Sequence, residues 1–224
     1  MDGEWRAWHR RYESDPQLIG RLPVVRSLLR DALDRAAPGP VRLLSLCAGD
    51  GRDLLGVVPE HPRRSEVRAV LVELDADLAE AARARARSAG LEQVTVRTAD
   101  AGRAESLAGA VPADILLACG IFGNVRDREV RSFVAHLPEL SAAGATTIWT
   151  RGTFEPDLTP AIRDWFREAG FEELAFVRVP GTAASVGAHR LVGSPRPFDA
   201  RARLFRFLPA DERPYRLRPP EAGT

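Results

Sequence analysis

Between residues 41 and 169, short apolar runs alternate with segments of helical pattern, and this alternation restricts the fold more than any other feature of the chain. The runs hold four to six residues rich in Val, Leu and Ile, as buried strands do. Strands and helices that alternate in this way form a parallel sheet with helices on both faces. The predicted fold class is therefore α/β, with a doubly wound, mostly parallel sheet. We place the strands at 41–46, 67–72, 94–97, 114–118 and 146–150, and the helices at 52–58, 76–89, 129–137 and 159–169.

The ends of the chain extend this core. Apolar residues from Leu18 to Leu33 have helical spacing, and with the aromatic segment before them they predict two N-terminal helices; Pro23 is tolerated there only near a helix start. Two further apolar runs flank Pro180-Gly181 and predict an antiparallel hairpin at the sheet edge, which gives about seven strands.

These patterns divide the chain into three parts. We expect an N-terminal helical cap over residues 1–40 and the sheet domain over 41–194. A C-terminal extension, 195–224, is packed on the domain or trails from it, with a short strand at 204–208.

Composition excludes several classes of function. All 32 basic residues are Arg, so the chain has neither a Schiff-base lysine nor the lysine of a phosphate-binding loop. A formal charge of +1 gives no electrostatic reason to bind nucleic acid. No apolar run reaches the roughly 20 residues of a membrane span, and the N-terminus does not resemble a secretory signal, so we expect a cytoplasmic protein. The two cysteines, Cys47 and Cys119, are expected to be reduced thiols.

A glycine turn and two acidic residues follow successive strands. The turn, Cys47-Ala-Gly-Asp-Gly51, lies where an open parallel sheet binds its ligand, but Leu54 stands where a dinucleotide site has its third glycine. Glu73 comes directly after the next strand, 22 residues beyond Gly51, where a carboxylate accepts hydrogen bonds from ribose hydroxyls. Asp100 follows the third strand and is placed to accept a hydrogen bond from an adenine amino group; a helix cap or turn residue is the alternative.

Four motifs in this order resemble those of a known enzyme family. They are Leu44-Ser-Leu-Cys-Ala-Gly-Asp-Gly51, Leu71-Val-Glu-Leu-Asp75, Thr98-Ala-Asp100 and Asp114-Ile-Leu-Leu-Ala118. By them the segment from Val41 to Ala169 is similar to the class I SAM-dependent methyltransferases, which have a Rossmann-like fold. The resemblance implies S-adenosyl-L-methionine (SAM) as the cofactor, with Gly49 and Gly51 beside its methionine moiety, Glu73 at the ribose and Asp100 at the adenine.

One position departs from the family's pattern. The family often has Asp or Glu where Cys47 stands, an acid that helps to hold the methionine ammonium group. Asp50, Asp53 or a backbone carbonyl would have to substitute, although the dipole of a helix at 52–58 explains Asp53 equally well. The full set of expected cofactor-binding residues is Tyr12, Cys47, Ala48, Gly49, Gly51, Asp53, Glu73, Leu74, Ala99, Asp100, Ala101, Cys119, Gly120 and Asn124.

Residues that act on a substrate are expected in the loops that face the methyl group. Methyl transfer needs a nucleophile held opposite the sulfonium and, where necessary, a group that removes a proton. Asn124, the only Asn of the chain, is a candidate contact, with a left-handed turn residue as the alternative. Arg151 is a candidate for an anionic substrate group or else a surface charge. His189 is the best-placed general base, or else a structural histidine.

The sequence thus predicts a methyltransferase that acts on an O, N or C atom of a small molecule, as a monomer or homodimer. It needs no metal, because no cluster of His, Asp and Glu has the spacing of metal ligands. Two alternatives stay open. One is a non-catalytic module that binds SAM or a nucleotide, and the other is a nicotinamide-dependent oxidoreductase.

Overall fold

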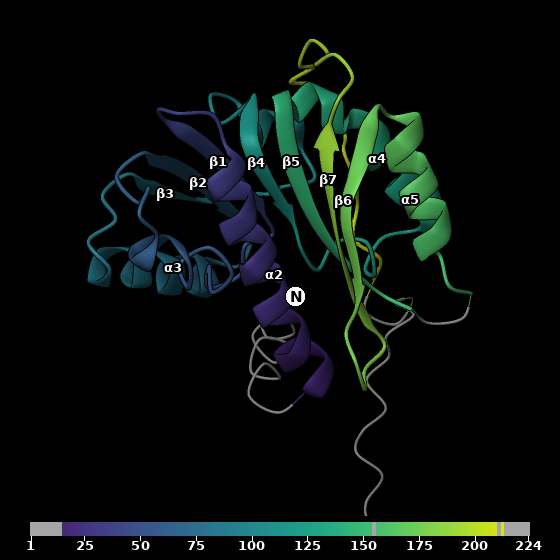
Figure 1. Cartoon of the computed structure of the whole chain (residues 1–224), viewed down its shortest axis with the longest axis horizontal. Helices are drawn as coiled ribbons and strands as arrows, with labels where there is room; N and C mark the ends of the chain where they lie inside the picture. Colours follow the sequence, from purple (N-terminus) through teal and green to yellow (C-terminus); the bar gives the residue numbers. More distant parts are fainter. Residues whose placement is uncertain (1–14, 154–155, 210–211, 213–224) are drawn as a thin grey trace, which may run out of the picture.

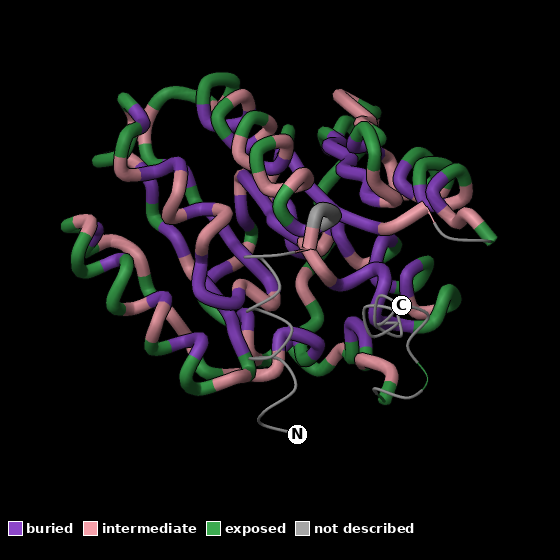
Figure 2. The backbone as a smooth tube through the Cα atoms, turned by 90° about the horizontal axis from the view of Figure 1, so that it is seen from below, coloured by how far each residue is buried: buried purple, intermediate pink, exposed green. Residues whose placement is uncertain are grey.

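The computed structural model describes residues 15–153, 156–209 and 212, and it shows a seven-stranded sheet with helices on both faces (Figure 1). Most residues of the five inner strands are buried and those of the two edge strands are mostly partly buried, whereas the exposed residues gather on the helices and in the loops (Figure 2). The elements are α2 (Pro16–Arg35), β1 (Val41–Leu46), the 3-10 helix η2 (Val58–Glu60), β2 (Val67–Glu73), α3 (Ala76–Ser88), β3 (Val94–Thr98), the 3-10 helix η3 (Ala104–Leu107), β4 (Ala113–Ala118), α4 (Asp127–Leu140), β5 (Ser141–Gly152), α5 (Thr159–Glu168), β6 (Phe171–Arg178) and β7 (Ala184–Leu191).

The strand order is β3-β2-β1-β4-β5-β7-β6. Strands β1 to β5 are parallel, and β7 pairs antiparallel with both β5 and β6. The predicted fold class and edge hairpin are therefore confirmed. Strand order reverses between β1 and β4, where Leu44 lies opposite Leu116, so the loops after these two strands meet at the carboxyl edge of the sheet.

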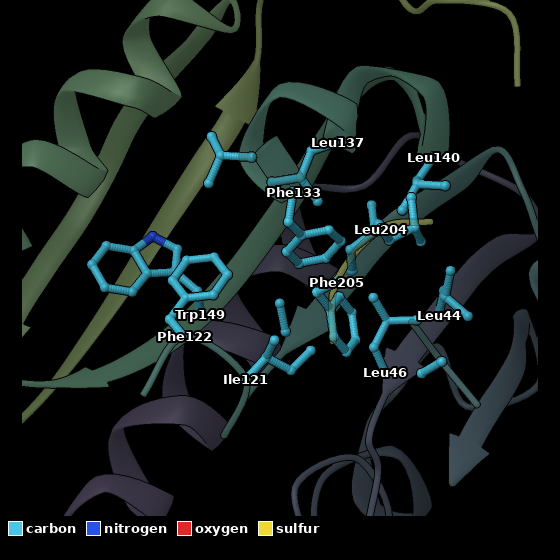
Figure 3. Packing of buried hydrophobic residues seen from close by; sticks show 14 of the residues in the cluster. Leu44, Leu46, Ile121, Phe122, Phe133, Leu137, Leu140, Trp149, Leu204 and Phe205 are labelled. Carbon is cyan, nitrogen blue, oxygen red and sulfur yellow. The ribbon is translucent and has the colours of Figure 1, made fainter. Parts of the chain in front are cut away.

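Each face of the sheet carries its own apolar core. On one face, Leu29 of α2 and Ala82 of α3 pack against side chains such as Leu43. On the other face, α4 and α5 cover the sheet through a cluster rich in aromatic side chains (Figure 3). In that second cluster Phe122 stacks on Trp149 at a ring distance of 5.5 Å.

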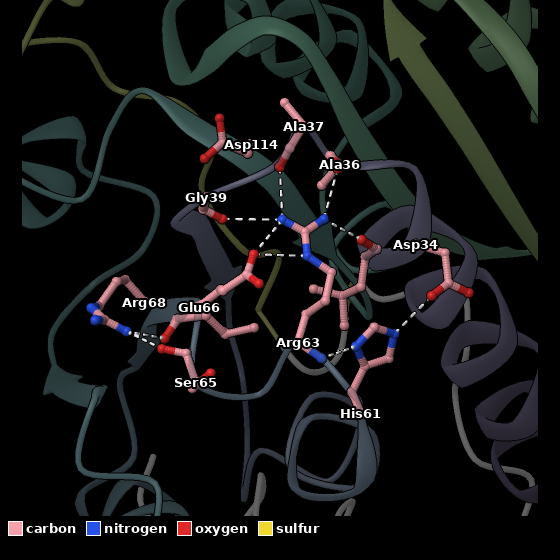
Figure 4. A network of polar contacts seen from close by, with 12 residues as sticks. Asp34, Ala36, Ala37, Gly39, His61, Arg63, Ser65, Glu66, Arg68 and Asp114 are labelled. Atoms are coloured by element: carbon pink, nitrogen blue, oxygen red, sulfur yellow. Dashed lines mark hydrogen bonds and ion pairs between the residues drawn. The ribbon is translucent and has the colours of Figure 1, made fainter.

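Arg63 fixes the end of α2 to the chain before β2 (Figure 4). Its guanidinium forms an ion pair with Glu66 at 2.7 Å. The last carbonyl groups of a helix have no partner within the helix, and a long cationic side chain is well suited to supply donors to them. Arg63 donates to the main-chain oxygens of Leu33, Ala36, Ala37 and Gly39, at 2.8, 2.7, 2.7 and 3.0 Å.

Three local predictions are wrong. The segment 52–58 forms turns rather than a helix, because the Arg26 guanidinium takes the main-chain oxygen of Arg52 at 2.7 Å and fills the space beside Gly56. Residues 204–208 form no strand; Arg203 makes only an isolated bridge with Arg103. Pro23 lies inside α2 rather than near its start.

Candidate functional site

The glycine turn after β1 is tightly held. The N–H of Ala48 donates to the Val72 oxygen at 3.1 Å, which links the turn to the end of β2. Cys47 has a φ of 52°, the only positive value at a non-glycine position among the described residues. Gly51 has a φ of 72°, and a Cβ there would meet Leu71 at 2.9 Å. Such backbone conformations are costly outside glycine and concentrate at functional sites, so this turn is the starting point of the candidate site.

Glu73 connects the turns after β1 and β2. The residue is 8% exposed, and its carboxylate accepts the N–H of Gly49 at 2.7 Å and that of Asp75 at 2.9 Å. Burial raises the pKa of this carboxyl, and the backbone hydrogen bonds oppose that rise. A carboxylate has about four acceptor positions, so further hydrogen bonds to a ligand are chemically possible. Leu74, beside it, is 60% exposed, which leaves an apolar side chain next to a fixed carboxylate.

Asp100 lies in the loop after β3 and faces two donors. Its Oδ1 accepts the N–H of Gly102 at 2.9 Å, and its Oδ2 accepts Nη1 of Arg203 at 2.7 Å. The N–H of Ala99 donates to the main-chain oxygen of Glu73 at 2.9 Å, so the loops after β2 and β3 lie against each other. Ala101, in the second of these loops, is buried. Arg203 has no counterpart in the sequence predictions, because nothing in the Pro- and Arg-rich extension singles it out.

The loop after β4 is held from β5. Thr150 accepts the N–H of Gly120 on its Oγ1 at 2.8 Å. Asn124 donates from Nδ2 to the Gly120 oxygen at 2.7 Å, and its own main-chain oxygen accepts the N–H of Leu208 at 2.8 Å. The alternative of a left-handed Asn124 is wrong, since Cys47 alone among described non-glycine residues has a positive φ. The structure thus brings Gly120 and Asn124 together beside the glycine turn.

Arg151 is buried rather than a surface charge, which corrects that alternative. Its side chain is 8% exposed, its Nη1 donates to the Phe122 oxygen, and its Nη2 lies 3.3 Å from Asp127. Its Nε has no hydrogen-bond partner among the described residues. The guanidinium therefore fixes the loop after β4 from within.

His189 lies in the core. His189 pairs with Thr147 of β5, three positions and so about 10 Å before Thr150, the residue that holds the loop after β4. The ring is 1% exposed, accepts Nε1–H of Trp149 at 3.2 Å and stacks on Phe166 at 4.2 Å. Burial lowers the pKa of His189 to about 4. The structure does not bring it to the candidate site, and its contacts are those of the structural alternative.

The two cysteines lie at the carboxyl ends of neighbouring strands. The register of Ser45 with Leu117 places Cys47 opposite Cys119 two residues further on. The left-handed backbone of Cys47 turns its side chain to the core of the α4 face, whereas Cys119 packs against the core of the α2 face. Burial raises the pKa of both thiols. The negative charge of Glu73 raises the pKa of Cys47 further, and that of Asp53 raises the pKa of Cys119 further.

The two candidate replacements for the missing acid differ in their surroundings. Asp50 is 5% exposed and forms ion pairs with Arg52 at 2.7 Å and with Arg85 at 3.1 Å. Asp53 and Cys119 are close enough for each to influence the other's pKa, and burial raises the pKa of the Asp53 carboxyl against the opposing charge of Arg21. The helix-dipole explanation for Asp53 has no basis, because no α-helix begins at this turn. Asp53 thus lies near the loop after β4, whereas Asp50 is paired with Arg52 and Arg85.

Three further predictions concern Tyr12, metal ligands and membrane spans. Tyr12 lies outside the described residues. Within residues 15–153, 156–209 and 212, no three His, Cys, Asp or Glu side chains gather as metal ligands would. In the same part of the chain, no helix is long and apolar enough to cross a membrane.

Comparison with known proteins identifies the fold. No family model and no curated protein sequence matches the chain. Magnesium protoporphyrin IX methyltransferase from Synechocystis PCC 6803, with bound SAM, aligns over 83% of this chain and 90% of its own, at 15% identity and a TM-score of 0.63. The chain has the class I SAM-dependent methyltransferase fold.

Two other methyltransferases with this fold differ in what they act on. The 1,6-didemethyltoxoflavin-N1-methyltransferase from Burkholderia thailandensis, solved with bound 1,6-didemethyltoxoflavin and S-adenosylhomocysteine (SAH), aligns over 86% of this chain and 91% of its own, at 18% identity and a TM-score of 0.59. An RNA methyltransferase from Salinibacter ruber, with SAH, aligns over 80% and 97%, at 22% identity and a TM-score of 0.53. The fold is shared by proteins with small and large substrates, so it decides no substrate by itself.

Proposed function

We propose that the protein is a SAM-dependent methyltransferase that acts on a small molecule. The observation that carries the proposal is Glu73, a buried carboxylate fixed by Gly49 and Asp75 beside the exposed Leu74. A ribose offers hydroxyl donors to such a carboxylate, and an adenine ring offers an apolar face to such a leucine. The residues present therefore fit the cofactor that the fold implies.

The other residues of the site divide the remaining contacts. Asp100 would accept a hydrogen bond from the adenine amino group, with Ala99 and Ala101 beside the ring. The turn Cys47-Ala-Gly-Asp-Gly51 would lie along the methionine moiety. Asp53 is the better substitute for the missing acid, since two arginines already neutralise Asp50. The bound cofactor supplies an activated methyl group on a sulfonium. The protein's part is to orient the substrate and exclude water, and Gly120 and Asn124 are the loop residues proposed to contact it.

A small-molecule substrate agrees with the formal charge of +1, which gives no strong net attraction to nucleic acid. We assign no general base. Arg151 and His189 stay candidates from sequence only, because each side chain is engaged inside the protein. Metal independence is a further prediction, and activity that EDTA abolishes and magnesium restores would contradict it.

Replacing Glu73 with Gln tests the proposal. The neutral amide keeps the shape but loses the charged acceptor, so SAM should bind more weakly by about 1 to 3 kcal/mol in isothermal titration calorimetry. Glu80→Gln is the matched control, because Glu80 is an exposed carboxylate on α3 that pairs with arginines outside the site. Equal SAM affinity of the Glu73→Gln variant and the wild type, with both folded by circular dichroism, would remove Glu73 from the site.

A further inference from the structure

Residues 202–208 of the extension, here called the C-terminal strap, lie against the loops after β3 and β4. The N–H of Ala104 donates to the Ala202 oxygen at 3.1 Å, and the N–H of Leu204 donates to the Gly102 oxygen at 2.8 Å. At its other end the N–H of Leu208 donates to Asn124 at 2.8 Å. The strap thus joins the loop that holds Asp100 to the loop after β4.

The strap is anchored in the core. Leu204 and Phe205 are each 2% exposed, and Phe205 packs edge-on against Phe133 at a ring distance of 5.1 Å (Figure 3). The Phe205 oxygen approaches Gly102 so closely that a Cβ on this glycine would lie 2.3 Å from it. Backbone contacts of this kind leave the strap little freedom to shift relative to the loop after β3.

Arg203 extends this contact to the Asp100 side chain. Its Nη1 lies 2.7 Å from Oδ2, while Oδ1 accepts the Gly102 N–H, so each carboxylate oxygen accepts one hydrogen bond; Nε of Arg103 lies 3.9 Å from Oδ2, beyond hydrogen-bond distance. About two of the four acceptor positions of the carboxylate are left for a ligand. The Asp100 and Arg203 side chains are each 34% exposed, and an ion pair with that much solvent contact adds little to stability. Its effect is on the orientation of the carboxylate.

We propose that the C-terminal strap is part of the cofactor site, and that Arg203 is a positioning residue that sets Asp100 for the amino group of the cofactor's adenine. This inference rests on the proposed function. A carboxylate held in one orientation loses less conformational entropy when a ligand binds. The gain in affinity therefore belongs to the one hydrogen bond between Asp100 and the adenine amino group.

Two nucleosides that differ only at that amino group test the inference. The probes are SAH and its 6-deamino analogue, in which a hydrogen replaces the amino group and the ring nitrogens are unchanged, and calorimetry on the full chain gives the ratio of their Kd values. The wild type should prefer SAH by about tenfold or more, since the analogue offers Asp100 no donor. In Arg203→Met the preference should fall severalfold, with the melting temperature nearly unchanged.

Three further variants complete the test. Arg203→Lys should keep most of the preference, because it retains a charged donor. Arg201→Met is the matched control, since Arg201 is exposed in the same segment, and it should behave as the wild type. In an Asp100→Asn background, Arg203→Met should change the preference no further if Arg203 acts through Asp100. Should Arg203→Met not fold, Arg203→Gln takes its place with the same expectation.

Each outcome has one meaning. An unchanged preference in Arg203→Met, or an equal loss of affinity for both nucleosides, overturns the positioning role. A wild type that binds SAH without preferring the amino group also overturns the inference and leaves the proposed function standing. A wild type that binds neither nucleoside contradicts the proposed function itself.

Discussion

At the scale of single residues, Glu73 has a structural task as well as its proposed binding task. Its carboxylate holds the N–H groups of Gly49 and Asp75, and so fixes the turns after β1 and β2 against each other. A side chain already fixed in this way pays little conformational entropy when it accepts the hydroxyls of a ribose. The charge that the protein buries there thus prepares the site for its ligand.

His189 makes a prediction about stability and pH. Burial lowers its pKa to about 4, with Glu173 opposing the shift and Arg163 adding to it, whereas the unfolded chain has a histidine pKa of about 6.5. Between these two pKa values His189 is protonated in the unfolded chain but neutral in the folded chain. The free energy of unfolding therefore falls as the pH drops from about 6.5 toward 4. This one residue should account for a loss of about 2 to 3 kcal/mol between pH 7 and pH 4.5.

Urea unfolding of His189→Gln measures that contribution, because glutamine does not titrate. The variant should be less stable than the wild type at pH 7 but should lose less stability on acidification. His136→Gln, on the outer part of α4, is the control and should follow the wild type. The same pH dependence in His189→Gln and the wild type would show that the pKa of His189 is not lowered.

At the scale of elements, the segment between β3 and β4 explains why the strap is needed. The chain forms only the four-residue η3 there, so a short helix leaves part of the sheet face to be covered. Leu204 and Phe205 fill that place from the far end of the sequence. The apolar run at 204–208 predicted a strand in an extension that packs on the domain or trails from it, but no sequence pattern indicates which part of the sheet face Leu204 and Phe205 cover. The helix predicted at 52–58 is absent for a similar reason. The guanidinium of Arg26, on the distant α2, takes the main-chain oxygen of Arg52.

Replacing Phe205 with Ala tests the role of the strap in the fold. The change removes a ring buried against Phe133 and leaves a cavity, so the free energy of unfolding should fall by about 3 to 5 kcal/mol in urea or thermal denaturation. Phe207→Ala is the control, since Phe207 is only partly buried, and it should cost less. A loss below about 1 kcal/mol for Phe205→Ala would mean that the strap is not part of the core.

At the scale of the whole molecule, the mostly parallel sheet and the sheet edge at which the motif residues lie were predictable from the sequence. Alternating runs predict a parallel sheet, and the motifs place Gly49, Glu73 and Asp100 at its carboxyl edge, where the structure has them. The surroundings of Arg151 and His189 were not predictable. Whether a polar side chain at a strand end turns to a loop or into the core depends on the packing of distant elements. The apolar periodicity of the sequence contains no information about that packing.

The two thiols test the strand order in solution. Cys47 and Cys119 end the strands that flank the switch point, and the raised pKa of each thiol predicts slow reaction with a maleimide at neutral pH. Saturating SAM should slow the reaction further, because the bound cofactor would cover the turns that hold the two residues. Mass spectrometry of Cys47→Ser and Cys119→Ser separates the two sites. Thiols that react at the same rate with and without bound SAM would contradict their place in the crevice.

The central claim is that this fold holds SAM, and the most direct measurement is calorimetric titration of the purified full chain with SAM and, separately, with NAD. We expect saturable binding of SAM with about one site per chain and no binding of NAD, because Leu54 replaces the glycine that a dinucleotide pyrophosphate requires. Binding of NAD in place of SAM, or of neither nucleotide, would contradict the account.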